Sequence, residues 1–378
     1  MPIKEIAYSA QQTLEASING SVKRAHVYEL LAAAHGFNSY AALSSDAVFT
    51  YRRLGYRVPA THGAYVRRRF MELGYPSEKA DLVPIALEAF LAERKIGVVG
   101  ISALIRQLRS NCFDTDDSAF DDDENQNDRV AEEWAENDGD DFPAILLEGL
   151  EAAASKDNSS AHYALALIHL PNHEEDAGSL HWYTQSQQGH ELTGVKKEWA
   201  EAYAAQLIRE EKHSHHLHQA GRLGNPEALL DLAEEFGDPS FFAQAHDKVD
   251  ADPAHVAGIA GQLGRDADEK HWLTVAAESG DVEAMLCLIE GHDQNDLFRC
   301  WTWAYLSELV GTDLTRDAHY AINEDGSNYD DDVGGPMYVG GRDRINLDSL
   351  SAEQDAAAQD AAQELFDLIQ QVTEQDSR

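Results

Sequence analysis

The chain has 378 residues, of which 43% are apolar and 26% are charged, and its formal net charge is −39. This length suits two or more domains, since single hydrophobic cores seldom grow beyond roughly 250 residues. No apolar run approaches the ~20 residues of a membrane-spanning helix, and the N-terminus lacks the basic flank and apolar stretch of a secretory signal. The three cysteines form no C-x-x-C pair. We therefore expect a cytoplasmic protein without a membrane segment.

The charge is divided unevenly along the chain. Residues 1–110 contain 14 Lys and Arg against 9 Asp and Glu, a net charge of +5, whereas residues 111–378 contain 15 against 59, a net charge of −44. An acidic body repels nucleic acid and anionic membrane surfaces. A basic N-terminal part attracts either of them, or the acidic remainder of its own chain.

Residues 1–110 are predicted to form a basic helical unit. The pairs Gly36-Phe37, Gly55-Tyr56 and Gly74-Tyr75 are each 19 residues apart and follow helix-like runs. Glycine just beyond a helix adopts the left-handed conformation at no steric cost, and the aromatic neighbour can fold back on the last turn. The pattern predicts helices over residues 22–35, 40–54, 64–73 and 77–94, the last N-capped by Ser77 and interrupted or restarted at Pro84.

Composition changes abruptly after this unit. The 28 residues from Asp114 to Asp141 contain 14 carboxylates and a single arginine. Like charges at this density repel one another, and the low apolar content cannot offset the entropy lost on ordering. We predict an acidic linker over residues 111–141.

Positions that end helices recur from residue 142 to residue 314. They are Asp157, Gly189, Gly224, Gly280 and Gly311, at intervals of 32, 35, 56 and 31 residues. Trp182, Trp272 and Trp303 lead three of these phrases, and we expect each large aromatic to fill the groove of a neighbouring repeat while the glycines allow tight turns. The interval of 56 is too long for one unit. An extra or degenerate helix over 254–264 is therefore expected within an irregular region, residues 237–265.

The phrase WLTVAAESGDVEAMLCLI, residues 272–289, resembles the repeat of the Sel-one-like family, relatives of tetratricopeptide repeats. The resemblance implies an all-α fold, an α/α solenoid of helical hairpins over 142–314, in which no unit buries its apolar face alone. It also implies an adaptor or scaffold that holds a protein or peptide on the concave face. Residues 23–43 resemble a short helical element at the N-termini of uncharacterised bacterial proteins, to which no activity is attached.

The chain after the repeats is predicted to be an irregular loop segment over residues 315–350, followed by a C-terminal capping helix and tail over 351–378. Ser351 with Gln354 three residues on forms a capping-box signature at the start of this helix. An apolar stripe on the helix suits the open end of a solenoid: Ala358, Ala361, Ala362, Leu365, Leu368, Ile369 and Val372.

Two clusters in the sequence contain side chains that could bind a metal ion. His213, His215, His216 and His218 offer imidazole ligands, but one helix cannot turn all four inward, and His216 aligns with Trp182 and Trp272 as a packing residue. The loop with Asp325 and residues 330–332 offers carboxylates, but its spacing does not match a helix-loop-helix calcium site. We expect no metal and no cofactor.

The basic residues Arg67, Arg68 and Arg69, with Arg52, Arg53 and Arg57, form the candidate binding cluster of the N-terminal unit. Arginines that neutralise phosphates would give salt-sensitive nucleic-acid binding. Three consecutive helical residues, however, fan out over about 200°, so they cannot all face one groove.

The sequence contains no phosphate-binding glycine loop, no G-x-S-x-G motif and no H-E-x-x-H motif, and we expect no enzymatic activity. We predict a non-catalytic interaction scaffold whose partner is a basic protein or peptide. The alternative is a nucleic-acid-associated regulator that acts through residues 1–110. An enzyme hidden in that unit would require a pocket, which the sequence cannot reveal.

Overall fold

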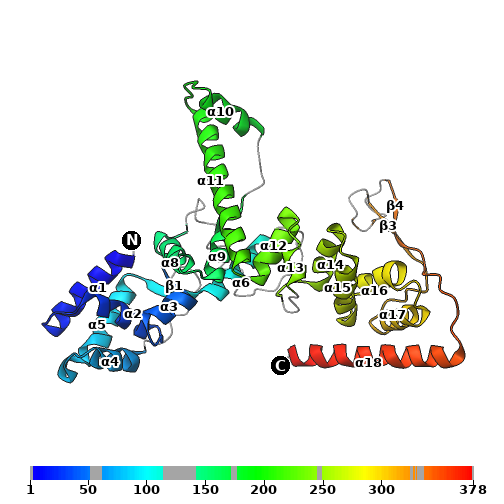
Figure 1. Ribbon diagram of the computed structural model, residues 1–378, viewed down its shortest axis with the longest axis horizontal. Coiled ribbons are helices and arrows are strands. Elements are labelled where there is room, and N and C mark those ends of the chain that lie inside the picture. Colours follow the sequence, from blue (N-terminus) through cyan, green and yellow to red (C-terminus); the bar gives the residue numbers. More distant parts are fainter. Residues whose placement is uncertain are drawn as a thin grey trace. The chain divides into compact units, whose positions relative to one another are not determined.

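The computed structural model describes residues 3–51, 62–113, 142–171, 177–244, 249–323, 327, 329 and 336–376. The chain is mostly helical and divides into two compact units, Met1–Leu232 and Ala233–Arg378. The division falls within helix α12 (Pro226–Phe236), and the order of the elements can be followed in Figure 1.

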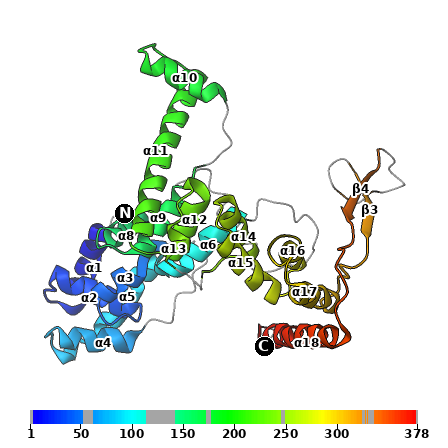
Figure 2. The same cartoon turned by 45° about the vertical axis from the view of Figure 1, so that its right-hand side comes forward.

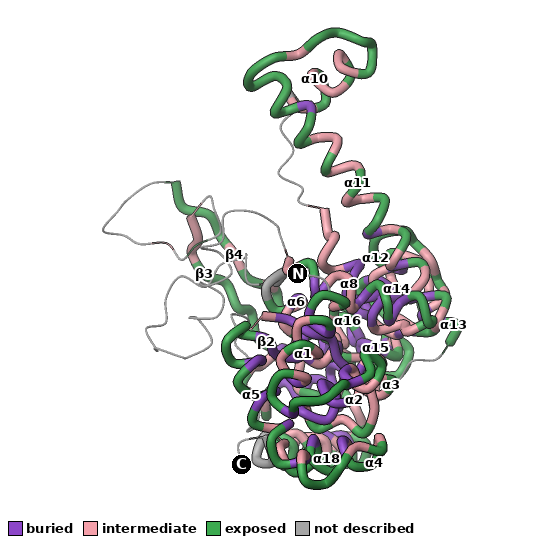
Figure 3. Tube along the Cα trace, turned by 90° about the vertical axis from the view of Figure 1, so that its left-hand side faces the viewer, coloured by how far each residue is buried: buried purple, intermediate pink, exposed green. Residues whose placement is uncertain are grey.

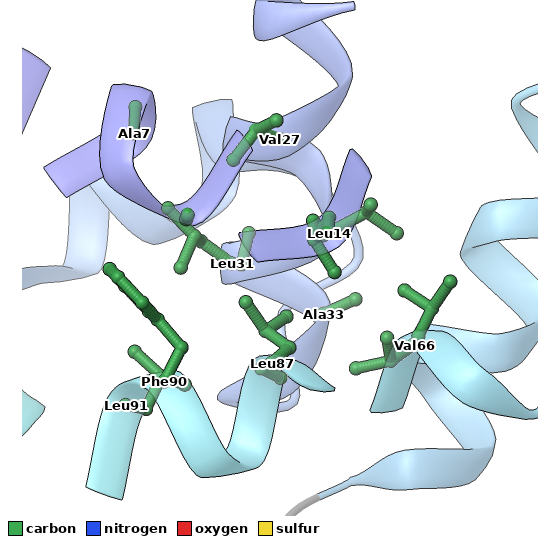
Figure 4. Packing of buried hydrophobic residues seen from close by; sticks show 14 of the residues in the cluster. Ala7, Leu14, Val27, Leu31, Ala33, Val66, Leu87, Phe90 and Leu91 are labelled. Carbon is green, nitrogen blue, oxygen red and sulfur yellow. The ribbon is translucent and has the colours of Figure 1, made fainter. Parts of the chain in front are cut away.

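The N-terminal unit, from here on the compact unit Met1–Leu232, begins with a helical core. Helix α1 buries Ile6, Ala10, Leu14 and Ile18, which are spaced four residues apart and so line one face of the helix. Figure 4 shows side chains of this core, among them Leu14, Leu31 and Leu87. The helices of this part are α1 (Ile3–Ile18), α2 (Arg24–Ala34), α3 (Tyr40–Asp46), α4 (Gly63–Glu72), the short 3₁₀ helix η1 (Ser77–Lys79) and α5 (Leu82–Glu93).

The glycine-aromatic pairs end helices as the spacing predicts. Gly36 has φ +84° and Gly74 has φ +89°. The amide N–H groups of Phe37 and Tyr75 donate to the carbonyls of Ala32 and Phe70, which closes the last turns of α2 and α4. The third pair, Gly55-Tyr56, lies outside the described residues.

The helix expected over residues 40–54 is wrong, because α3 stops at Asp46 and strand β1 (Ala47–Tyr51) follows. β1 pairs with β2 (Ile96–Gly100) in an antiparallel ladder that sets Val48 opposite Val99 and Phe49 opposite Val98. Aromatic and β-branched side chains suit a strand whose faces are both covered. The fold is therefore mostly helical but not purely α.

Residues from both sides of the expected linker share one hydrophobic core. Val48, Val99 and Leu104 pack with Leu146 of α8 and Leu165 of α9. Residues 114–141 themselves lie outside the described residues. The helices that join this core are α6 (Ile101–Phe113), α8 (Ala144–Ala154), α9 (Ser159–Ile168), α11 (Val195–Arg222) and the first part of α12.

Helix α11 has 28 residues and two different environments. Its C-terminal half packs on α9 and buries His213, Leu217 and Ala220, whereas its N-terminal half pairs with α10 (Ala177–Gln187). Figure 3 shows that α10 and the adjoining half of α11 bury little surface.

The C-terminal unit is built from short helices joined by tight turns. Its irregular region contains α13 (Ser240–Ala243) and α14 (Pro253–Gln262), which confirms the extra helix expected over 254–264. The other helices are α15 (Asp266–Glu278), α16 (Val282–Cys287), the π-helical turn η2 (Leu288–His292), α17 (Leu297–Leu309) and α18 (Ala352–Asp376).

The segment expected to be irregular contains a hairpin. Strand β3 (Ala318–Ile322) pairs antiparallel with β4 (Tyr338–Arg342), with Tyr320 opposite Gly340. After it, α18 lies along α17 in both ribbon views (Figures 1 and 2). The backbone N–H of Gln354 donates to Ser351 Oγ at 3.3 Å, which confirms the predicted cap. Among the described helices, none combines the length and the apolar character needed to cross a membrane.

Candidate functional site

The five helix-ending positions aligned in the sequence all have positive φ. The angles are 59° at Asp157, 84° at Gly189, 80° at Gly224, 102° at Gly280 and 111° at Gly311. At Gly280 a side chain would also meet Ile369 of α18, since an added Cβ would lie 3.7 Å from its Cδ1. That distance is an ordinary van der Waals contact, so this turn needs glycine for its backbone conformation and not for space.

Trp272 and Trp303 are buried in the C-terminal unit, with 7% and 4% of their surface exposed. The Trp272 ring lies 6.2 Å from the ring of Phe241, between centroids. The Trp303 indole N–H donates to Asp293 Oδ2 at 3.0 Å. Both side chains pack between helices of this unit and present little surface to a ligand.

Trp182 has a different environment. It is half-buried on α10, and the Lys196 ammonium lies 4.4 Å from the centroid of its ring. Gly189 ends α10 in the part of the unit where little surface is buried. The segment around Trp182 therefore ends in the same kind of turn as the segments around Trp272 and Trp303, but its tryptophan is not buried in a hydrophobic core as theirs are.

Among the described residues of the C-terminal unit, Asp293 is the buried carboxylate, and the sequence pattern did not single it out. Its side chain is 1% exposed and receives Lys270 Nζ at 2.6 Å and Arg299 Nε at 3.0 Å, as well as the Trp303 indole. Burial by itself raises the pKa of this carboxyl, but its hydrogen bonds with Lys270 and Trp303 and the charge of Arg299 lower the pKa below its usual value. One carboxylate thus ties α15 to α17.

The arginine cluster is paired with carboxylates of its own unit. Arg67 lies 2.5 Å from Asp81, Arg68 lies 3.6 Å from Glu72 and above the Tyr65 ring, and Arg69 bonds both Glu29 and Glu72. Hydrogen bonding to Glu29 raises the pKa of Arg69. A phosphate would have to displace these partners. Arg52, Arg53 and Arg57 lie outside the described residues.

Replacing Arg69 with alanine is expected to lower the free energy of unfolding by about 1–2 kcal/mol, because its partly buried bonds join α4 to α2. The matched change Arg68→Ala, at an exposed pair within α4, should cost at most about 0.5 kcal/mol. Urea denaturation followed by circular dichroism compares the two variants. Equal losses would contradict the structural role of Arg69.

The histidines of α11 face in different directions. His213 is buried, and its Nδ1–H donates to the carbonyl of Ala166 at 2.9 Å, whereas His215 and His218 are exposed. His216 Nδ1 lies 3.0 Å from His162 Nδ1, and the rings of His216 and His169 stack with centroids 6.4 Å apart. Burial lowers the pKa of both His169 and His216 to about 4. Their neutral rings pack α11 on α9.

One group of possible metal ligands occurs among the described residues. Asp317, His319 and Asp343 stand next to the β3–β4 hairpin, with donor atoms within 4.8 Å of one another, and all three are exposed. His319 Nε2 is 3.1 Å from Asp343 Oδ1. Exposed groups of this kind form surface ion pairs without a metal. Asp325 and residues 330–332, the earlier calcium candidates, lie outside the described residues.

The outer side of α18 combines carboxylates with exposed apolar side chains. Ala358 and Ala362 are fully buried on the packed side, and the Tyr305 hydroxyl donates to Asp355 at 2.6 Å, which fixes the rotation of the helix. With about 100° per residue, Leu368 and Val372 lie between this packed side and a row of carboxylates. Leu368 is 56% and Val372 61% exposed. The carboxylates of the row are Asp360, Glu364 and Asp367.

This arrangement corrects one expectation for α18. Ala358 and Ala362 of the predicted apolar stripe pack against the C-terminal unit, whereas Leu368 and Val372 of the same stripe remain on the surface. Helix α18 contains seven Asp and Glu and no Lys or Arg. Its outer side is the candidate functional site, an acidic surface with an apolar border.

Comparisons with protein-family models, with curated proteins and with solved structures found no match to this chain. The resemblance to Sel-one-like repeats therefore rests on the residues quoted above.

Proposed function

We propose that this protein is a non-catalytic scaffold related to Sel-one-like repeat proteins, and that it binds a basic, amphipathic segment of another protein. The observation that carries the proposal is the outer side of α18, where Leu368 and Val372 are exposed beside Glu364 and Asp367. An amphipathic helix can place its apolar residues on such a border.

The charge of the C-terminal unit supports a basic partner. Residues 233–378 contain 32 Asp and Glu against 8 Lys and Arg, a net charge of −24. Of those basic residues, Lys270 and Arg299 bond Asp293, and Arg265 bonds Asp268. Positive side chains of a partner would meet a surface of opposite charge, which speeds association and favours basic segments over acidic ones.

The nucleic-acid alternative has less support. The described arginines of the candidate cluster already bond carboxylates, and they lie on different sides of α4. A regulator that binds phosphates through these residues would first have to break these pairs, of which the Arg69–Glu29 pair joins α4 to α2.

The test begins with affinity capture from the native cell and continues with the captured partner's basic segment in a direct binding assay. We expect Leu368→Ser with Val372→Ser to weaken binding at least tenfold, since each exposed apolar side chain contributes about 1 kcal/mol or more when covered. Raising the salt from about 0.05 M to 0.5 M should weaken binding as well, because screening shortens the range of the attraction.

The control is Leu180→Ser, which changes a leucine of similar exposure, 49% against 56% for Leu368, on α10 of the other unit. It should leave binding unchanged. Binding that is insensitive to salt, or equal losses for the control and the α18 variant, would rule out this surface as the docking site.

A further inference from the structure

A pocket of about 250 Å³ lies within the N-terminal unit, against α8, the end of α9 and the middle of α11. From α8, α9 and the segment just before α8 the lining takes the apolar side chains of Phe142, Leu147 and Ile168, followed by His169. From α11 it takes Ala205, Ile208, Arg209 and Lys212, of which Ile208 is 55% exposed. Basic side chains against an apolar wall are the features by which small sites orient a charged ligand.

The charge of this pocket is opposite to that of the protein as a whole. Arg209 and Lys212 bring two positive charges to its lining, in a chain whose net charge is −39. The C-terminal end of α9 offers the negative end of its helix dipole, which is equivalent to about half a charge, and the charge of Lys212 alone exceeds it. These cations favour an anionic ligand over a neutral one.

The imidazoles beside the pocket do not form a metal site. His169 stacks on His216, which meets His162 through their Nδ1 atoms, but no three donor atoms of this row converge on one point among the described residues. Lys212 and Arg209 would also repel a cation at His169. The row therefore supports the wall of the pocket, and the ligand class is anionic.

We propose that this pocket binds a small organic anion, with its apolar body against Phe142, Leu147 and Ile168 and its carboxylate at Lys212 and Arg209. The volume lies below the ~300–1,000 Å³ of pockets for drug-sized ligands, so the ligand is a medium-chain or single-ring acid. This site lies in a different unit from α18, and its occupation does not depend on the proposed scaffold function.

Binding of such an acid is linked to the proton on His169. Burial, followed by the charges of Lys212, Arg209 and His213, lowers the pKa of His169 to about 4, and the neutral His216 ring stacks on it. A carboxylate beside these cations would offset their charge and raise the pKa of His169. By reciprocity, binding should strengthen as the pH falls from 7 towards 5, as long as the ligand stays ionised.

The experiment uses the full chain and isothermal titration calorimetry with octanoate and benzoate at pH 7. A single saturable site with a dissociation constant of about 0.1–1 mM is expected for ligands of this size. Octanol tests the need for the charge, inorganic phosphate tests an anion without an apolar body, and N-acetyl-alanyl-leucine distinguishes a free acid from the end of a peptide. Octanol and phosphate should bind at least about tenfold more weakly than octanoate.

Variants locate the site. Lys212→Gln should weaken octanoate binding about tenfold, and Ala205→Phe, which adds bulk to the lining of the pocket, should abolish binding without changing the charge. Lys197→Gln is the matched control, because Lys197 is an exposed lysine on α11 outside the pocket. Ring signals of His169 in NMR spectra should titrate at higher pH with octanoate than without it.

Several outcomes would overturn the proposal: no saturation by either acid, equal binding of octanol and octanoate, or the same loss in Lys197→Gln and Lys212→Gln. Tighter binding of the peptide acid than of octanoate would contradict the assignment to a small acid. Unchanged His169 titration in the presence of bound octanoate would place the ligand elsewhere.

Discussion

Replacing Asp293 with alanine is expected to lower the free energy of unfolding of the C-terminal unit by roughly 3–5 kcal/mol. The change removes the buried carboxylate that both Lys270 and Arg299 bond, and it leaves these two cations without their partner. Lys270 and Arg299 keep 40% and 39% of their side-chain surface exposed, so water can solvate them after the change. We therefore expect the lower part of this range. Urea denaturation, followed by tryptophan fluorescence, measures the loss.

The control for this variant is Asp268→Asn. This change removes the carboxylate that pairs with Arg265, three residues earlier, at the start of α15. The Asp268 side chain is 31% exposed, against 1% for Asp293, so its pair should contribute less than about 1 kcal/mol. If both variants lost the same amount, the bonds of Asp293 would have no special weight in the stability of this unit.

The Asp293 bonds also predict a pH dependence. Its pKa is lowered in the folded protein, so the unfolded chain takes up the proton more readily. The stabilisation is therefore complete above the ordinary pKa of an aspartate, about 4, and is lost as the pH falls through the folded value. In Asp293→Asn the fall in stability below about pH 4 should be shallower than in the parent.

Local signals in the sequence predicted the local features of the fold. A glycine beyond a helix is recognisable because only its own φ matters, and Gly36, Gly74, Gly280 and Gly311 all adopt positive φ. The cap at Ser351 follows equally from residues three positions apart. The extra helix α14 was likewise visible as a short apolar run between turns.

Features that depend on residues far apart in the chain could not be predicted from local sequence patterns. The strand at residues 47–51 forms because residues 96–100 pair with it, and no local period reports a partner that distant. The β3–β4 hairpin was missed for the same reason, since its strands are separated by residues 323–337. The shared core of β1, β2, α8 and α9 could not be predicted either, because the acidic run between them suggested independent parts.

The candidate site was predictable only in part. The apolar stripe of α18 was visible from its spacing, but which side of it remains exposed depends on the contacts of Ala358 and Ala362. Asp293 stands among other polar residues, and nothing in the sequence DQND distinguishes a buried carboxylate from an exposed one. Its importance follows from Lys270, 23 positions earlier, and from Trp303, ten positions later.

Trp303→Ala is expected to lower the free energy of unfolding by roughly 3–5 kcal/mol, as for other buried large-to-small changes. The side chain is 4% exposed and its indole N–H donates to Asp293, so packing and hydrogen bonding are both lost. Trp303→Phe separates the two contributions, because phenylalanine retains much of the apolar volume and removes the N–H. Trp272→Phe is the matched control, because it shrinks a buried tryptophan that packs on Phe241.

The hydrogen bond can then be isolated with a double-mutant cycle of Trp303→Phe and Asp293→Ala, since alanine, unlike asparagine, leaves no acceptor for the indole N–H. Two residues in direct contact through a charge-assisted bond should show a coupling of about 1–3 kcal/mol. Trp272→Phe combined with Asp293→Ala should be additive within about 0.5 kcal/mol, because no bond joins those side chains. Equal coupling in both cycles would mean that Trp303 stabilises the unit by packing alone, and that Asp293 holds α17 through Arg299 and not through the indole.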